Sequence, residues 1–198
     1  MRIIVVGATG TIGTPLAAAL AERHEVVGNR NGDYQVDVAD QGSIERLFRD
    51  VGPFDALVSL AGGARFKPVG ELTDEDFAFS LAHKLMGQIN LVRAGLAQVR
   101  DGGSFTLTSG VLSQEPMPGS SVITLVNRGL EGFARAAALE MPRGVRINVV
   151  SPPWVTETLA ELGWDTSAGM PAARVAPAYV ECVEGSRNGE TLDARDFV

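Results

Sequence analysis

The sequence predicts an α/β fold in which a doubly wound parallel sheet lies between two layers of helices. Short apolar runs rich in β-branched residues alternate with helical segments along the chain, and this alternation is typical of parallel sheets. The first run, Ile3 to Val6, leads directly into a glycine-rich turn and then a helix. The 198 residues are enough for a sizeable core, so we expect a single domain over residues 1–198.

Most of the expected strands are followed by a turn and then by a helical segment, as in right-handed βαβ units. The expected strands cover residues 3–6, 25–28, 34–38, 55–60, 104–108, 145–150 and 190–194. The expected helices cover residues 11–23, 43–50, 74–99, 120–141, 157–162 and 172–183. Thr73 is a predicted N-cap, because acidic residues follow it in the positively charged first turn. We expect Gly102 and Gly103 to stop that helix and Pro142 to end the next one.

Charge and cysteine content narrow the class of protein. A formal net charge of −7 argues against a general nucleic-acid binder, because phosphate backbones attract basic surfaces. Cys182 is the only cysteine, so no intramolecular disulfide is possible, and a partly buried helix position explains it better than a nucleophilic role. No apolar run reaches the length of a membrane-spanning helix, and the N-terminal run is too short for a signal peptide. We expect a soluble, cytoplasmic protein without a metal site.

A turn of sequence GATGTIG follows the first expected strand. Glycines here allow a tight turn and a close approach of backbone N–H groups to a pyrophosphate, and the following helix N-terminus adds partial positive charge. We predict that this turn binds a dinucleotide. The residues expected to contact it are Gly7, Thr9, Gly10, Thr11, Ile12 and Gly13. The alternative is a turn that only packs a helix against a strand.

The end of the second expected strand indicates which dinucleotide binds. A carboxylate at this place holds the ribose hydroxyls of NAD, whereas a cation accommodates the additional phosphate of NADP. The sequence has Asn29 and Arg30 here, and the first acidic residue is Asp33. Because arginine pairs with phosphate in bidentate fashion, we expect NADP rather than NAD, with Asn29 and Arg30 at the cofactor. A solvated turn arginine is the alternative.

Five motifs, in order over nearly the whole chain, resemble those of the short-chain dehydrogenase/reductase family. They are GATGTIG, Asp37-Val38 at the adenine position, the loop Ser59 to Gly63, the strand that ends in Ser109, and the segment Arg146 to Pro152. The resemblance implies a Rossmann-like fold and an NAD(P)-dependent oxidoreductase with Ser109 as its catalytic serine. It also places Asp37, Val38, Ala61, Gly62, Gly63, Pro152 and Thr156 at the cofactor.

The sequence departs from the family at the usual catalytic Tyr and Lys, which lie four residues apart on one face of a helix. Alignment on LEGFARA puts Ile123 at the Tyr position and Asn127 at the Lys position. On the preceding long helix, the position of the family's usual Asn holds Lys84. We interpret this as a swap of the two residue types. Lys84 would reach the same cavity from the neighbouring helix, with Asn127 as its hydrogen-bond partner, and would supply, directly or through a water, the proton that the Tyr usually supplies. Two independent losses in a degenerate site are the alternative.

Two functions remain open from the sequence. The first is an NADP-dependent oxidoreductase that acts on a small carbonyl or alcohol with a non-standard proton donor, using Ser109, Lys84 and Asn127. The second is a catalytically inactive NAD(P)-binding redox sensor or regulatory protein of the same fold. The resemblance also implies a homodimer or homotetramer formed through the two long helices. We expect a small-molecule substrate, and neither nucleic acid nor membrane as a partner.

Overall fold

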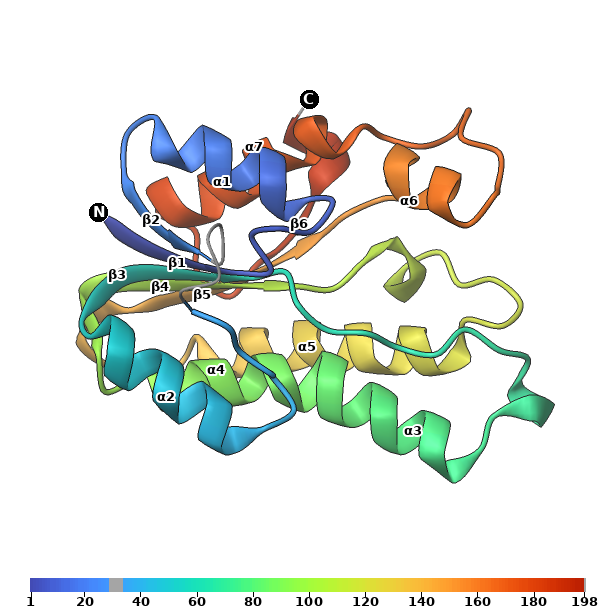
Figure 1. Ribbon diagram of the computed structural model, residues 1–198, viewed down its shortest axis with the longest axis horizontal. Coiled ribbons are helices and arrows are strands. Elements are labelled where there is room, and N and C mark those ends of the chain that lie inside the picture. The colour runs from blue at the N-terminus through green and yellow to red at the C-terminus, as the bar shows by residue number, and fades with distance from the viewer. Residues whose placement is uncertain (29–33, 198) are drawn as a thin grey trace.

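A computed structural model describes residues 1–28 and 34–197. Six strands form one parallel sheet in the order β2-β1-β3-β4-β5-β6, and helices cover both of its faces (Figure 1). The strands are β1 Arg2–Val6, β2 Glu25–Gly28, β3 Phe54–Ser59, β4 Val99–Thr108, β5 Arg146–Ser151 and β6 Thr191–Asp193. This arrangement confirms the expected α/β/α, Rossmann-like fold.

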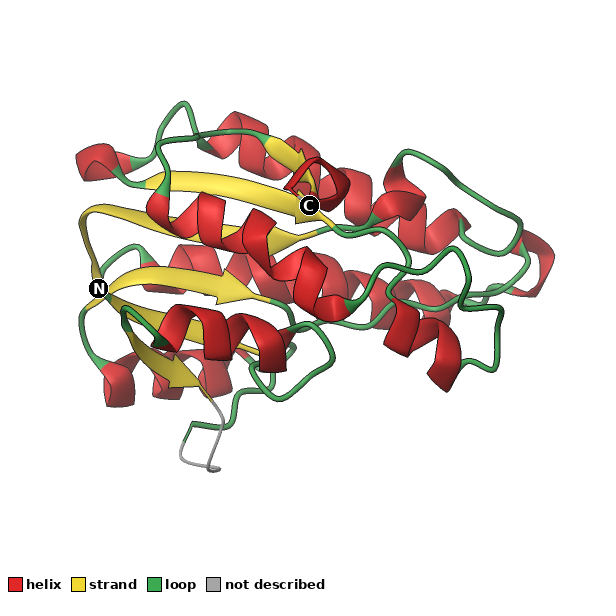
Figure 2. Ribbon diagram, turned by 90° about the horizontal axis from the view of Figure 1, so that it is seen from above, coloured by secondary structure: helices red, strands yellow, loops and turns green. Residues whose placement is uncertain are grey.

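The two helical layers enclose two apolar cores, one on each face of the sheet. One layer contains α1 Gly13–Ala21, α6 Thr156–Glu161 and α7 Ala172–Glu184, and the other contains α2 Gln41–Val51, α3 Asp74–Ser80, α4 Gly87–Gly95 and α5 Ser121–Ala137. A π-helical segment, Leu81–Met86, joins α3 to α4 without a break. Short 3₁₀ turns occupy Val69–Glu71, Val111–Ser113, Pro142–Gly144 and Ala194–Phe197. Seen from above, the strand arrows point to one end, where the longest loops gather (Figure 2).

Local capping explains where α3 begins. The Thr73 hydroxyl accepts a hydrogen bond from the Asp76 backbone N–H at 3.2 Å, and the Asp76 carboxylate accepts one from the Thr73 N–H at 3.0 Å. This capping box satisfies two backbone donors that the helix leaves free. Lys67, which lies 2.8 Å from the same carboxylate, lowers the pKa of Asp76 to about 2.

Two expected elements are wrong. Residues 34–38 form no strand; Tyr34 and Val36 pack on the core and are partly buried, and Val38 is buried against Gly87. Alternating burial of an extended segment therefore imitated a strand pattern. The helix expected to reach Val99 ends at Gly95, and Gly102 and Gly103 lie inside β4. A Cβ on Gly103 would lie 2.5 Å from the Asp55 carbonyl oxygen, so this glycine permits a close approach of β4 to β3 where their register shifts.

Within the described ranges, no helix is both long enough and apolar enough to cross a membrane.

Candidate active site

The turn after β1 requires glycine at positions 7 and 13. Gly7 has a φ of +89°, and its carbonyl oxygen accepts the Gly10 N–H at 3.0 Å. A Cβ on Gly13 would lie 2.0 Å from that same oxygen and 2.9 Å from the Ala8 backbone. The turn therefore brings the start of α1 directly against the end of β1, as a phosphate-binding turn requires.

No side chain caps the N-terminus of α1, and the Thr14 N–H donates to the Gly10 carbonyl oxygen at 2.9 Å. The N-cap residue Ile12 makes no side-chain capping bond, and the first turn contains no acidic residue. The remaining free N–H groups and the helix dipole favour an anion at this end of α1; the expected pyrophosphate contact stays a prediction. The remaining turn residues, Thr9, Gly10 and Thr11, lie between Gly7 and Ile12.

A small cavity of about 140 Å³ lies beside this turn, between the ends of β1 and β2. Its lining includes Gly7, Thr9, Gly28, Tyr34, Val36 and Ala61. The two residues expected at adenine are elsewhere: the Asp37 carboxylate accepts the Ala39 N–H at 2.9 Å, and Val38 packs on Gly87. Neither of them lines this cavity, and their role at adenine stays a prediction. Asn29 and Arg30 lie outside the described residues.

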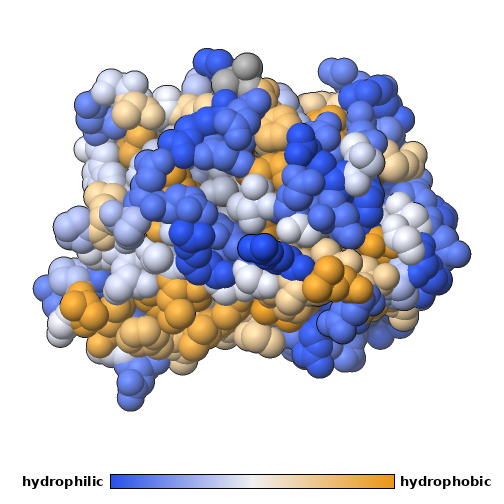
Figure 3. All heavy atoms as spheres, turned by 180° about the vertical axis from the view of Figure 1, so that it is seen from behind, coloured by the Kyte–Doolittle hydropathy of each residue, from blue (hydrophilic) through white to orange (hydrophobic). Residues whose placement is uncertain are grey.

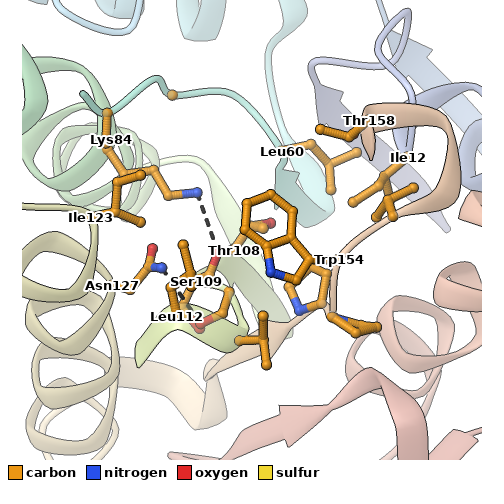
Figure 4. A pocket seen from close by; sticks show the side chains of 17 residues that line it. Ile12, Leu60, Lys84, Thr108, Ser109, Leu112, Ile123, Asn127, Trp154 and Thr158 are labelled. Carbon is orange, nitrogen blue, oxygen red and sulfur yellow. Dashed lines mark hydrogen bonds between the residues drawn. The ribbon is translucent and has the colours of Figure 1, made fainter. Parts of the chain in front are cut away.

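A larger cavity of about 360 Å³ lies at the carboxyl ends of β1, β3, β4 and β5 (Figure 4). Ligands of open parallel sheets bind at this edge. Ile12, Gly62 and Pro152 line the cavity, as do all three expected catalytic residues. Gly63 contacts Phe79 instead. Thr158 lines the cavity, whereas Thr156 does not. The Thr156 hydroxyl lies beside Gly169 instead, since a Cβ on that glycine would lie 2.9 Å from the hydroxyl oxygen.

The π-helical segment carries Lys84 into this cavity (Figure 4). The Lys84 amine donates to the Ser109 carbonyl oxygen at 3.4 Å, and a Cβ on Gly62 would lie 3.0 Å from the Lys84 Cα. Gly62, with a φ of +130°, thus lets the loop after β3 cover the lysine. Part of the side chain stays exposed, yet burial lowers the pKa of Lys84 from its usual 10.5 to about 8. An amine with such a pKa is suited to proton transfer near neutral pH.

Ser109 and Asn127 present unpaired polar atoms to the same space. Ser109 is 5% exposed and Asn127 is 2% exposed. The Asn127 amide donates to the Gly110 carbonyl oxygen at 3.5 Å, but its Oδ1 and the Ser109 hydroxyl have no partner among the described residues. Buried polar atoms are ordinarily paired. The Ser109 hydroxyl and Asn127 Oδ1 are thus both free to bond to a polar group in the cavity that Lys84 also lines.

Comparison with known proteins decides the family. The family model described as Enoyl-(Acyl carrier protein) reductase, from the short-chain dehydrogenase/reductase group, matches residues 4–178. The chain belongs to the short-chain dehydrogenase/reductase family. This confirms the resemblance that the five sequence motifs indicated.

Individual relatives of this short-chain dehydrogenase/reductase are distant in sequence and close in fold. An uncharacterized oxidoreductase from Methylorubrum extorquens is 28% identical over 165 residues, which cover 79% of this chain and 66% of that protein. The chain thus spans slightly less than two thirds of that relative. The crystal structure of the protein lin1944 from Listeria innocua has a TM-score of 0.93 at 40% identity, with 98% of each chain covered. A small-chain dehydrogenase in complex with NADPH has a TM-score of 0.84 at 25% identity and covers 98% of this chain and 95% of its own.

The described residues that line the larger cavity of this short-chain dehydrogenase/reductase include no tyrosine. The chain has two tyrosines, of which Tyr34 lines the small cavity and Tyr179 is fully buried behind Thr108. The Tyr179 hydroxyl lies 3.0 Å from the Thr108 hydroxyl, and burial raises the pKa of Tyr179. Ile123 and Asn127, assigned by alignment to the usual Tyr and Lys positions, both line the cavity. Cys182 is buried, and this burial raises the pKa of its thiol to about 12, which disfavours a nucleophilic role.

Gln88 is a site residue that the sequence motifs missed. Its side chain is fully buried and donates to the Lys84 carbonyl oxygen at 3.2 Å and to the Thr108 carbonyl oxygen at 3.0 Å. It also accepts the Thr108 N–H at 2.9 Å. One amide therefore fixes the lysine-bearing helix against the strand that carries Ser109. A glutamine four residues after Lys84, on the buried face, was the available signal.

Replacing Gln88 with leucine should separate these two elements. The change leaves the Thr108 N–H and carbonyl buried without partners, which costs about 1–3 kcal/mol per group. We expect a lower free energy of unfolding in urea and a kcat reduced by about tenfold. Asn90→Leu is the matched control, because the Asn90 side chain accepts only from Arg93 at the surface. Wild-type stability and kcat in Gln88→Leu would contradict the positioning role.

Proposed function

We propose that this chain is an NADP-dependent oxidoreductase that reduces a small carbonyl compound, or oxidises the alcohol, with Lys84 as its proton donor. One observation carries the proposal: the Lys84 amine, the unpaired Ser109 hydroxyl and the unpaired Asn127 Oδ1 all line one cavity at the carboxyl edge of the sheet. Three groups that donate to or accept from a ligand, in a pocket whose remaining described lining is mainly apolar, suit a reacting carbonyl.

The residues present fit a dinucleotide. The glycine turn and the uncapped start of α1 would hold the pyrophosphate, and Ile12, Gly62 and Pro152 would border the nicotinamide end. When bound, the reduced nicotinamide supplies a hydride. Preference for NADP rests on Arg30 in the sequence, and a structural neighbour is in complex with NADPH.

The chain's own residues orient the carbonyl and move the proton. The Ser109 hydroxyl donates a hydrogen bond to the substrate carbonyl oxygen and polarises it. The Lys84 ammonium donates its proton to that oxygen as negative charge develops there. Asn127 Oδ1, which has no partner among the described residues, is available to accept from the ammonium or from the substrate hydroxyl once a ligand is bound. In the oxidation direction, neutral Lys84 accepts the hydroxyl proton.

A thermal-shift comparison tests cofactor binding first. A ligand at 100 times its Kd stabilises the native state by about 2.7 kcal/mol, and the stabilisation grows as Kd falls. At equal concentration, NADPH should therefore raise the melting temperature more than NADH. With NADPH present, Ser109→Ala should lower kcat on a carbonyl panel by about tenfold or more, whereas Ser113→Ala, a buried serine outside the cavity lining, should not. A larger shift with NADH would reject the NADP preference, and equal turnover in both variants would reject the serine's role.

The absence of a tyrosine from the described cavity lining favours a second candidate, a redox sensor that binds NADPH without hydride transfer. The same experiments separate the two. A thermal shift with NADPH, combined with no turnover on any carbonyl by the wild-type chain, would support the sensor.

We also propose that the chain forms a homodimer or homotetramer through its long helices. Figure 3 shows a band of apolar side chains across the helical layer that contains α5. Exposed apolar residues on this layer include Leu81 and Met86 on the π-helical segment and Leu125 on α5, which is 50% exposed. Gly129 packs on Leu85, while Gly132 faces open space. Light scattering of the purified chain measures the assembly directly.

A further inference from the structure

Three aromatic side chains form a continuous cluster from the cavity wall to the protein surface. The Trp154 and Trp164 ring centroids are 5.3 Å apart, and those of Trp164 and Phe66 are 5.8 Å apart with an edge-on angle of 70°. Trp154 lines the cavity, while Trp164 and Phe66 are 40% and 38% exposed. The three residues come from the loops after β3, β5 and α6, so only the fold brings them together.

The cavity has a polar side and an aromatic side. Lys84, Ser109 and Asn127 lie together on one side, and the Trp154 indole extends into the space facing them (Figure 4). The described lining between them is mainly apolar, with Leu60, Leu112 and Ile123 among its side chains. Lys84 is the single charged residue of that described lining, which contains no carboxylate.

We propose that this cavity takes an uncharged aromatic carbonyl compound, with its ring against Trp154 and its carbonyl oxygen toward Ser109. The inference rests on the proposed function and names the substrate class of the same site. A flat ring gains offset or edge-on contact with the indole beyond its buried area. A sugar-like substrate would place hydroxyl groups against Leu112 and Ile123 without partners, and burying such groups unpaired is costly.

The supporting rings keep Trp154 in place. Trp164 packs against one side of it at an interplanar angle of 56°, and Phe66 supports Trp164 in turn. Phe66 is itself held against Gly119, where a Cβ would lie 2.9 Å from its ring. A ring that is fixed before the ligand arrives loses little freedom on binding, which favours rigid, flat ligands.

Reduction of an aromatic carbonyl compound needs one hydride and one proton. The carbonyl carbon gains a hydride from the reduced cofactor, and the oxygen gains a proton from Lys84. The C=O double bond becomes a single bond, the cofactor is oxidised, and an aromatic aldehyde leaves as the benzylic alcohol.

The first test compares four aldehydes of different character with NADPH. We expect kcat/KM to be highest for benzaldehyde, about tenfold above shape-matched cyclohexanecarbaldehyde, with butanal and the charged glyoxylate lower still. Trp154→Ala should lower the benzaldehyde value about tenfold, chiefly through KM, and change the butanal value less than twofold. Trp154→Phe should restore the preference. A wild-type preference for butanal or glyoxylate, or an equal loss on all four in Trp154→Ala, would overturn the inference.

The second test does not depend on turnover. Both tryptophans of the chain belong to this cluster, so their fluorescence reports on it directly. With the Ser109→Ala variant and NADP⁺, benzyl alcohol should give a saturable change at lower concentration than cyclohexylmethanol, and adding Trp154→Phe should remove most of it. If benzyl alcohol binds in this way but the wild-type chain turns over no carbonyl, the aromatic site next to Trp154 stands and the proposed reaction is rejected. If the wild-type chain reduces aliphatic aldehydes but benzyl alcohol binds no better than cyclohexylmethanol, the proposed reaction stands and the aromatic site is rejected.

Discussion

Replacing Lys84 with methionine is expected to reduce kcat for carbonyl reduction by about 10²–10⁴-fold, the usual contribution of a positioned acid. Methionine keeps the length of the side chain and removes the proton. NADPH binding, measured by calorimetry, should change little, because the Lys84 amine donates to the Ser109 carbonyl oxygen and is not among the residues proposed to hold the pyrophosphate. The only other lysine, Lys67, supplies the control. Lys67→Met breaks the pair with Asp76 and should cost stability, not turnover.

The pH dependence gives this prediction its sharpest form. Burial lowers the pKa of Lys84 to about 8, and reduction needs the ammonium form. The rate of reduction should therefore be level below pH 8 and fall above it, while the rate of alcohol oxidation should rise over the same range. Any remaining activity in Lys84→Arg should lack this inflection, because arginine stays protonated. A wild-type reduction rate that stays level far above pH 8 would contradict the assignment.

The burial of Lys84 also makes the free energy of unfolding depend on pH, and this dependence runs opposite to that of the reduction rate. Between pH 8 and 10.5 the unfolded chain holds a proton on Lys84 that the folded chain has released, so the free energy of unfolding contributed by this residue increases with pH. Below pH 8 the folded state carries the full cost of a buried ammonium. Lys84→Met should therefore be more stable than wild type at pH 7, and this advantage should shrink toward pH 10. A less stable variant at pH 7 would contradict the prediction.

Gly13→Ala is expected to abolish NADPH binding and lower the free energy of unfolding by about 1–3 kcal/mol, as overpacking does. The new Cβ would lie 2.0 Å from the Gly7 carbonyl oxygen, and backbone cannot rotate aside as a side chain can. Urea unfolding and calorimetric titration measure the two effects.

Gly132→Ala is the matched control for Gly13→Ala. A Cβ at Gly132 meets nothing within 4 Å, and alanine within a helix should stabilise the protein by about 0.5–1 kcal/mol. Cofactor binding should remain as in wild type. If Gly13→Ala bound NADPH with wild-type affinity, the glycine turn would have no role at the cofactor.

Local patterns predicted most of the fold because they record burial. The apolar run Ile3 to Val6 and the acidic start after Thr73 each depend on near neighbours, and the structure confirms both elements. The segment 34–38 failed because alternating burial does not require a strand partner. The helix ends early at Gly95, where a Cβ would lie 3.0 Å from the rings of Phe48 and Phe105, and both rings are distant in sequence.

The candidate site was predicted in part, because motif spacing identifies residues in register with the family and not those that the tertiary fold brings to the site. Counting from motifs selected Ser109, Lys84 and Asn127, and the structure places all three on one cavity; their catalytic roles stay predictions. Counting did not reveal the π-helical segment, whose wider turn changes the direction of each later side chain relative to a regular helix. Nor did it reveal Gln88, because the place of this side chain depends on its contact with Thr108 on a strand that only the whole fold brings to it.

Ile123 has a consequence for engineering. In the proposed mechanism the proton comes from the π-helical segment, so the α5 position that borders the substrate carries no part of the chemistry. Ile123 lines the cavity and is half-buried, which leaves it free to differ in size and shape. A library at position 123 could reshape substrate scope while the acid, the serine and the cofactor turn all stay intact.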